Sequence, residues 1–496
     1  MSGEGRPSSV AVLTALTAAV AAAYPLLYIV VALLRMAYPF ELEWLEGGSL
    51  VQVQRILAGD PLYTRPSLSY VAFPYPPLYY YVAAAVAAAV GPGFHALRLV
   101  SFVASLFSLA AIFDIVRRET GRLLPALVAA GAFAGTYPAA GAWLDVGRVD
   151  SLWLALVLLA IHRIRFGRTA RSQAVAGALL CLAFFTKQVA VVAVAGFAVH
   201  HLLWRRRHAP ALLGAVAAGI LAGTLLMEKL TGGWFIWYVF RPHGLLPHRF
   251  LTFWRADVLP LLPVAVLGAI VLLAGAGPDR EKRRFYATFA AVMVGTGLFG
   301  RMISGAYLNA LLPACAGLAV LLGLALHEGQ ARLPPGQWRA PLESMLLGAV
   351  LLQLVMLASD PRAQLPTAAD RQAGERLTAR LAGLGATVVV PSHPYLAARA
   401  SGHAHAHAMA IADLLHLAPG PVADALERDM RQALCEHRFS AVVTNGTWRY
   451  QAELLRDYGP PLPLPELGDA FWPVTGARTR PSAVYIPRAS GANCIG

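Results

Sequence analysis

The sequence predicts a polytopic α-helical membrane protein of about 11 spans with a small C-terminal α/β domain. Hydrophobic residues make up 57% of the 496 residues and charged residues only 14%, whereas a soluble domain usually carries about 25% charged residues. The apolar residues form blocks long enough to cross a bilayer, and clusters of arginine separate these blocks. After Ser359, Pro, Gly, Arg and Asp become frequent and no further block is long enough to span.

The first apolar block, Val10–Leu34, contains no charged residue. A span needs about 20 apolar residues, and the apolar core of a cleaved signal peptide is shorter than this block. No Ala-x-Ala-like cleavage site followed by soluble sequence comes after it. We therefore expect a first membrane span that is retained.

Basic residues gather in short segments between the apolar blocks, and these segments indicate which loops lie in the cytoplasm. They are Arg117–Arg122, Arg163–Arg171, Arg205–Arg207 and Arg280–Arg284. Short loops rich in Lys and Arg stay in the cytoplasm, which predicts a bacterial inner-membrane protein with a cytoplasmic N-terminus and an extracytoplasmic C-terminal domain. The net charge of +14 then reflects topology. Membrane lipids are the expected surroundings, and we expect no nucleic acid because no binding motif accompanies the clusters.

The resulting membrane topology places a transmembrane domain at residues 1–358, with a long outer loop at 35–94. The expected spans are 10–34, 95–116, 123–140, 150–166, 172–186, 188–204, 209–231, 258–276, 285–300, 306–326 and 342–358. Within the outer loop, Pro77–Val90 is apolar but short for a span, so we interpret it as an interfacial or re-entrant helix. If it crossed, every later segment would invert and the arginine clusters would lie outside.

Residues 359–496 are predicted to form the α/β domain. Ala368–Leu384 has the apolar spacing of a helix, and Thr387–Val390 and Arg438–Thr444 are strand candidates. Helices alternating with strands are typical of a small α/β fold.

Histidine and cysteine in this domain give a weak signal. His403, His405 and His407 would share one face of a strand, but no Cys or acidic residue at ligand spacing accompanies them, so we expect a polar loop and no metal site there. A divalent metal elsewhere stays an open alternative. Cys435 and Cys494 both lie in the expected outer domain, where a disulfide between them is one alternative.

Two acidic segments follow apolar blocks on the expected outer side. The first contains Glu41, Glu43 and Glu46, and the last two share a helix face because they are three residues apart. The second contains Asp145 and Asp150. Favourable placement at helix N-termini explains such residues structurally, and a role in binding or reaction is the alternative.

Aromatic and basic residues accompany these acids. Tyr75, Tyr79 and Tyr80 form a Pro-stiffened cluster that suits either the membrane interface or contact with a ligand. Lys187 is a lone cation between two apolar blocks, where it either reaches toward headgroups or binds a phosphate. Arg241 and Arg301 make other outer loops basic, although outer loops are normally poor in Lys and Arg.

Taken in order, these segments resemble the GT-C glycosyltransferases, which include oligosaccharyltransferase catalytic subunits, protein O-mannosyltransferases and the lipid A aminoarabinose transferase. The resemblance covers roughly residues 10–330. It rests on Glu46-Gly47, Gly59-Asp60-Pro61-Leu62-Tyr63, Tyr75-Pro76-Pro77-Leu78-Tyr79-Tyr80, Asp145 with Arg148-Val149-Asp150, and Phe185-Thr186-Lys187. Many members have Asp-Glu-Gly where this chain has Leu45-Glu46-Gly47. The missing Asp leaves the choice of a base open among the glutamates at positions 41, 43 and 46.

The resemblance implies an inverting glycosyl transfer on the outer face. The donor would be a polyprenyl-phosphate-linked sugar, and the acceptor a lipid, glycan or protein whose attacking group loses its proton to a carboxylate. The departing lipid phosphate needs a cation. Such a donor needs no nucleotide site, which agrees with the lack of Walker and GxGxxG motifs.

Within that scheme we predict Glu46 as the base and Glu43 as the runner-up, with Asp145 and Asp150 as further catalytic residues. The expected phosphate-binding residues are Lys187, Arg148, Arg301 and Arg241, and the expected substrate-contacting residues are Tyr75, Tyr79, Tyr80 and Trp143. The alternative functions are a multi-span transporter or lipid flippase, and an inactive scaffold or receptor.

Overall fold

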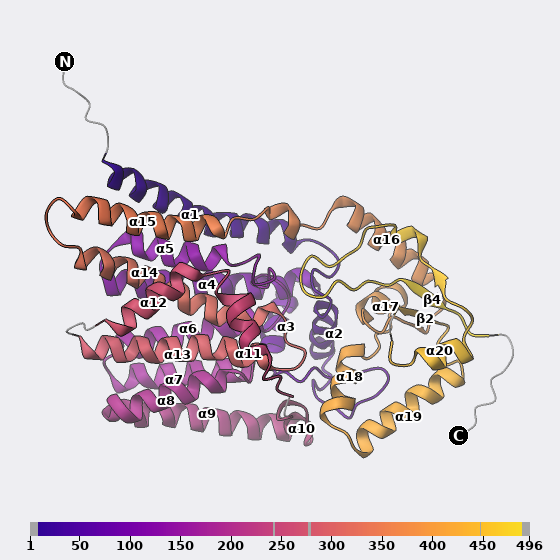
Figure 1. Cartoon of the computed structure of the whole chain (residues 1–496). Helices are drawn as coiled ribbons and strands as arrows, with labels where there is room; N and C mark the ends of the chain where they lie inside the picture. The colour runs from indigo at the N-terminus through magenta and orange to yellow at the C-terminus, as the bar shows by residue number, and fades with distance from the viewer. Residues whose placement is uncertain (1–7, 242–243, 276–278, 447, 489–496) are drawn as a thin grey trace.

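The computed structural model describes residues 8–241, 244–275, 279–446 and 448–488. Long helices of the N-terminal part lie side by side in a bundle, and the C-terminal part caps one end of it (Figure 1). We call residues 359–488 the C-terminal unit, and we keep the predicted division after residue 358 as a proposal. The helix before this point, α15, ends at Met356.

A helix coincides with each of the predicted spans. The helices are α1 (Ser9–Met36), α4 (Phe94–Thr120), α5 (Leu123–Gly135), α6 (Asp150–Phe166), α7 (Ala170–Thr186), α8 (Ala190–Trp204), α9 (Ala209–Leu230), α12 (Pro263–Ala274), α13 (Arg280–Met302), α14 (Leu312–Arg332) and α15 (Arg339–Met356). Among the described residues, 5 helices are long and apolar enough to cross a membrane, or up to 6 if a bent pair is one span. The total of about 11 spans therefore stays a prediction.

The surface of the bundle is apolar, which is unusual for a protein in water. Leu225 and Leu226 on α9 are 61% and 57% exposed, and Leu267 and Ile270 on α12 are exposed to a similar extent. The central helix α14 is instead buried along almost its whole length. Apolar side chains that face outward fit a bilayer, because lipid tails solvate them as well as a protein core does.

Shorter helices connect the bundle to its capped end. They are α2 (Glu46–Leu57), α3 (Leu78–Val90), α10 (Trp234–Val239), α11 (Arg249–Thr252), the π-helical turn η2 (Phe253–Val258) and the 3₁₀ turns η1 (Arg206–His208) and η3 (Leu308–Leu311). The 13 residues of α3 are about 20 Å long at 1.5 Å per residue. This is less than the roughly 30 Å hydrocarbon core. Since α5 also has 13 residues, length alone does not decide which of the two crosses, and the interfacial or re-entrant placement of α3 stays a prediction.

The C-terminal unit is an α/β fold, as predicted. Its four-stranded sheet has the order β1-β2-β4-β3, with β1 parallel to β2 and the other pairs antiparallel. The strands are β1 (Val388–Val389), β2 (Ala441–Thr444), β3 (Leu462–Pro463) and β4 (Ala483–Tyr485), and the helices are α16 (Ala368–Ala382), α17 (Pro394–Ser401), α18 (Ala408–Leu417), α19 (Pro421–Cys435) and α20 (Gln451–Asp457), with 3₁₀ turns η4 (Pro361–Gln364) and η5 (Pro465–Leu467). The predicted helix and both strand candidates are confirmed.

Different charged residues lie at the two ends of the bundle. At the end away from the C-terminal unit, Glu119 pairs with Arg165 and, at 3.4 Å, with Lys282. Arg205 and Glu281 pair at the same end, 2.7 Å apart. These ion pairs bring the predicted cytoplasmic segments together, whereas the acidic outer segments lie at the opposite, capped end.

Candidate active site

The first outer segment, residues 37–45, folds back between α1 and α2 and carries three buried carboxylates. Glu43 and Glu46 are fully buried and Glu41 is 7% exposed. A buried charge is costly unless it is paired and hydrogen-bonded, so the partner of each carboxylate defines what that carboxylate can do.

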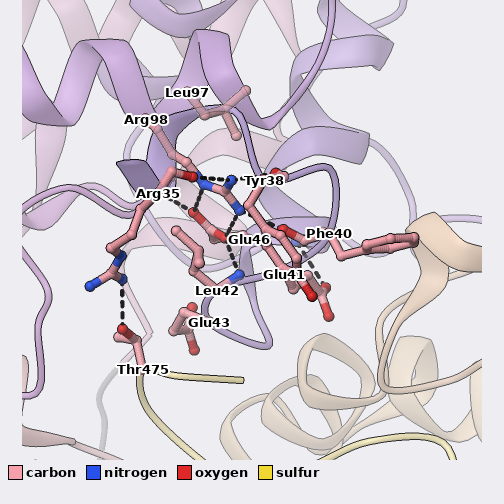
Figure 2. A network of polar contacts seen from close by, with 12 residues as sticks. Arg35, Tyr38, Phe40, Glu41, Leu42, Glu43, Glu46, Leu97, Arg98 and Thr475 are labelled. Carbon is pink, nitrogen blue, oxygen red and sulfur yellow. Dashed lines mark hydrogen bonds and ion pairs between the residues drawn. The ribbon is translucent and has the colours of Figure 1, made fainter. Parts of the chain in front are cut away.

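Glu46 accepts four hydrogen bonds. The Nε and Nη2 atoms of Arg98 lie 3.0 and 2.7 Å from its Oε1 and Oε2 (Figure 2). The backbone N–H groups of Leu42 and Gly147 donate to Oε2 and Oε1 at 2.7 and 2.6 Å. Burial alone would raise the pKa of Glu46, but Arg98 and these donors lower it. A carboxylate whose two oxygens already accept hydrogen bonds, and whose pKa is lowered, is a poor proton acceptor.

Arg98 was not identified by sequence analysis. Besides pairing with Glu46, its guanidinium hydrogen-bonds to the surrounding backbone. It donates to backbone carbonyl oxygens at 2.6–3.2 Å, those of Arg35, Tyr38 and Phe40. Its side chain is 1% exposed. The pair of Glu46 with Arg98 is therefore a buried anchor that fixes the outer segment to α4.

Glu43 is held differently. Its Oε2 accepts from Arg148 Nη1 at 3.2 Å and from the N–H of Leu45 at 3.1 Å. Its Oε1 has no hydrogen-bond partner among the described residues. Burial raises the pKa of Glu43 to about 7 although Arg148 lowers it. Of these two glutamates, Glu43 is thus the one with an oxygen that lacks a partner among the described residues and with a raised pKa.

Glu41 faces the C-terminal unit. Its Oε1 accepts from the N–H of Gly47 at 3.0 Å, and its Oε2 lies against Nδ1 of His393. Burial raises the pKa of Glu41 well above its ordinary value and lowers the pKa of His393 to about 3. Both directions favour a neutral pair in which the proton resides on Glu41.

The second acidic segment divides into two roles. Asp145 Oδ2 lies 3.1 Å from Arg35 Nε, and Tyr137 donates to Oδ1 at 2.8 Å. Asp150 begins α6 and pairs with Lys187 Nζ at 2.6 Å. Asp145 therefore has a buried structural partner, whereas Asp150 holds a cation that is 18% exposed.

Asp150 also resembles Glu43 in having one occupied and one free oxygen. Its Oδ1 accepts from Lys187 and from Asn309 Nδ2 at 3.0 Å, and its Oδ2 has no partner among the described residues. Arg148 interacts electrostatically with both acids. We call Glu43, Arg148, Asp150 and Lys187 the Glu43–Lys187 group. Its unpaired buried oxygens are exceptions to the usual pairing of buried polar atoms.

The predicted aromatic residues separate into two sets. The hydroxyl of Tyr75 accepts from Arg148 at 3.2 Å, and Trp143 stacks on Tyr307 with ring centroids 6.0 Å apart. By contrast Tyr79 is fully buried and donates to the carbonyl of Leu97. The structure thus places Tyr75 in contact with the Glu43–Lys187 group and Tyr79 in the core.

The remaining tyrosine, Tyr80, is 1% exposed and packs edge-on against its neighbour Tyr79, with ring centroids 5.8 Å apart. Contact of these two residues with a substrate stays a prediction. Both side chains are buried, and they contribute to the packing of α3.

Two predicted phosphate-binding arginines are engaged elsewhere. Arg301 forms a bidentate ion pair with Asp257, in which Nε and Nη2 donate to Oδ2 and Oδ1 at 2.8 and 3.2 Å. Arg241 stacks 4.6 Å over the ring of Trp237 and donates to its backbone carbonyl. Asp257 and Trp237 thus occupy these two arginines, and their role in binding a phosphate stays a prediction.

The histidines and cysteines also have defined places. His407 Nδ1 accepts from the N–H of Met409 and caps α18. No group of three or more His, Cys, Asp or Glu residues within the described ranges could hold a metal ion. Cys181 and Cys315 are buried free thiols. The alternative of a disulfide from Cys435 involves Cys494, which lies outside the described residues.

Comparison with known proteins agrees with this arrangement. Residues 75–241 match the family of dolichyl-phosphate-mannose-protein mannosyltransferases. The crystal structure of ArnT from Cupriavidus metallidurans bound to undecaprenyl phosphate matches with a TM-score of 0.57 at 14% identity, covering 95% of this chain and 99% of that one. The chain has a GT-C fold. With its apolar helices, this GT-C protein is a membrane protein.

Two further comparisons complete the picture. The apo structure of the same ArnT matches this GT-C protein with a TM-score of 0.56 at 14% identity, over 95% and 99% of the two chains. The oligosaccharyltransferase AglB from Archaeoglobus fulgidus gives a TM-score of 0.45 at 13% identity, over 87% and 71%. A comparison with curated proteins by sequence found no match.

Proposed function

We propose that this GT-C protein transfers a sugar from a polyprenyl-phosphate-linked donor to an acceptor on the extracytoplasmic face, with inversion and with Glu43 as the general base. The observation that carries the proposal is the Glu43–Lys187 group. It combines a buried carboxylate that has one free oxygen with two cations at the capped end of a GT-C bundle. The match to a mannosyltransferase family supports the choice of a sugar as the transferred group.

In the proposed reaction the hydroxyl or amine of the acceptor attacks the anomeric carbon of the donor sugar. Glu43 Oε1 accepts the proton that the attacking group loses. The bond between the anomeric carbon and the phosphate oxygen breaks on the opposite face, and its electron pair stays on the lipid phosphate. Attack and departure on opposite faces invert the configuration of the sugar.

The cations of the group serve the leaving phosphate. Lys187 lies 2.6 Å from Asp150, so its ammonium is held in place before the donor binds. Fixed charges directed at the position where negative charge develops lower the barrier without a cost of reorganisation. Asp150 acts in this scheme as a positioning residue for Lys187. That ArnT was crystallised with undecaprenyl phosphate supports a polyprenyl phosphate as the carrier.

A transfer assay with purified protein tests the proposal. Undecaprenyl-phosphate-linked sugars would be incubated with a crude lipid acceptor fraction, and the release of undecaprenyl phosphate measured. We expect release with wild type and a fall of at least about tenfold in kcat/KM for the donor in Lys187→Gln, since a charged hydrogen bond is worth about 1.5–3 kcal/mol.

Lys229→Gln is the matched control, because Lys229 is an exposed lysine in the last turn of α9. This variant should leave kcat/KM for the donor unchanged. Equal kinetics for the two variants, or transport of the intact donor without release of the phosphate, would contradict the proposal. The second result would favour a flippase.

A further inference from the structure

The C-terminal unit reaches into the candidate site through one short segment, residues 473–476. The backbone N–H of Thr475 donates to the carbonyl of Leu42 at 2.9 Å, and Thr475 pairs with Glu43 as in a parallel sheet. This segment thus holds the backbone beside the proposed base, although it lies at the other end of the sequence.

The hydroxyl of Thr475 makes a second connection. It accepts from Arg35 Nη2 at 2.9 Å (Figure 2) and lies 3.3 Å from the carbonyl of Ala142, to which it donates. Arg35 in turn pairs with Asp145. Arg35 is fully buried and Thr475 is 3% exposed, so water cannot replace a lost partner. Thr475 therefore links both acidic segments to the C-terminal unit, the first through its backbone N–H and the second through its hydroxyl.

Gly476 forms part of the wall around Glu43. A Cβ atom at this glycine would lie 3.1 Å from Glu43 Cγ and 3.0 Å from Trp143 Cη2, and the residue has φ +74°. Both the tight contact and the left-handed backbone favour glycine. Any larger residue here would press on the side chain that we propose as the base.

We infer that residues 473–476 are a positioning element of the transferase site, so that the C-terminal unit completes the active site. The segment holds Glu43 by its backbone and the Asp145 segment by the Thr475 hydroxyl. This inference rests on the proposed function for its kinetic consequence, but its structural consequence can be measured independently. A carboxylate that is misplaced by about 1 Å loses much of its catalytic effect even when it is chemically intact.

The test compares Thr475→Val, Thr475→Ser and Thr378→Val. Valine keeps the shape of threonine but leaves Arg35 Nη2 and the carbonyl of Ala142 without the hydroxyl, whereas serine retains it. Thr378 donates to Gly374 within α16, so its change to valine removes a hydroxyl from the same unit at a place that serves only its own helix.

Two readouts separate the inference from the proposed function. In Thr475→Val, hydrogen exchange of the amides of the Asp145 segment, residues 142–148, should quicken at least about tenfold, because the variant removes the hydroxyl that holds this segment. The value of kcat should fall about tenfold with the donor KM within about twofold, as for a group that acts mainly in the transition state. The serine variant and Thr378→Val should behave as wild type in both measurements.

Unchanged exchange in Thr475→Val overturns the inference, whatever the kinetics show. If exchange quickens while wild type transfers no sugar from any donor, the positioning role stands and the proposed function fails. If Thr475→Val does not fold, Gly476→Ala serves instead, since it leaves every hydrogen bond of Thr475 intact. It should lower kcat without altering the KM, and a wild-type kcat would overturn the inference.

Discussion

Glu43 and Glu46 lie three positions apart and are both fully buried, and each pairs with an arginine from a distant helix or loop. Glu46 accepts four hydrogen bonds and holds the outer segment to α4. Glu43 accepts two on one oxygen and, among the described residues, none on the other. Both carboxylates are fully buried, and the number of donors around each distinguishes the anchor from the proposed base.

This difference shows that burial does not by itself make a catalytic acid or base. Burial acts to raise the pKa of both residues, but only Glu43 ends near neutrality, because Arg98 and two backbone donors stabilise the charged form of Glu46. A base also needs an oxygen that a substrate proton can reach. The following changes would break or sharpen the contrast.

The largest effect is expected from Glu43→Gln. The amide keeps the shape of the side chain but cannot accept the proton, and general-base assistance is worth about 10²–10⁴-fold. Turnover of the lipid-linked donor should fall by that factor while the melting temperature stays near that of wild type. Glu46→Gln should show the opposite pattern, with lower stability and nearly normal turnover per folded molecule. If Glu46→Gln were inactive and Glu43→Gln active, the role of base would return to Glu46.

Arg98→Met should mainly reduce stability. It leaves the carboxylate of Glu46 buried without its cation, and breaking one side of a buried pair typically costs about 3–5 kcal/mol. Thermal unfolding in detergent measures the loss. Arg118→Met on the same helix is the control, because its pair with Asp114 is solvent-exposed and such pairs contribute at most about 1 kcal/mol. A stable but inactive Arg98→Met would mean that Arg98 takes part in the reaction.

The pH dependence should report the titration of Glu43. Because the base must be deprotonated, kcat/KM should rise about tenfold per pH unit below a pKa of about 7 and level off above it. Arg148 favours the charged form, so Arg148→Met should raise this pKa and move the rise to higher pH. A profile that is flat from pH 5 to 8, or one whose midpoint is the same in both proteins, would exclude Glu43 as the titrating group.

The smallest effect is expected from Glu41→Gln. The pKa shifts of Glu41 and His393 favour a proton on Glu41, and the amide of glutamine donates to His393 Nδ1 in the same way. We expect less than about a threefold change in turnover, since a neutral hydrogen bond is replaced by another. Turnover and melting temperature measured together check this. A loss as large as that of Glu43→Gln would assign the base to Glu41.

The fold was largely accessible from the sequence because lipid imposes long apolar blocks, and each predicted range became a helix. The contact of Asp150 with Lys187 was also within reach, because both residues flank apolar helices at the same expected surface. A charged residue next to an apolar membrane helix must lie near the membrane surface. Its position along the chain therefore indicates its depth in the membrane.

The partners within the site were not accessible in this way. Arg98 lies 52 residues beyond Glu46 and Arg148 lies 105 beyond Glu43. Arg98 stands inside an apolar helix with nothing local to mark it, and a sequence does not show which of several arginines a carboxylate meets. The segment around Thr475 carried no charge or motif at all, because it acts through a hydroxyl and its backbone.

The link between Arg35 and Thr475 joins residues that lie 440 positions apart. Protein synthesis adds about 5–20 residues per second, so on the order of 20–90 s pass between the two. During that interval the first span and its glutamates already exist, but the wall beside Glu43 does not. Under the proposed function, a growing chain therefore carries its base without the geometry to use it, and lipid-linked donor is not consumed before Thr475 and Gly476 have been synthesised.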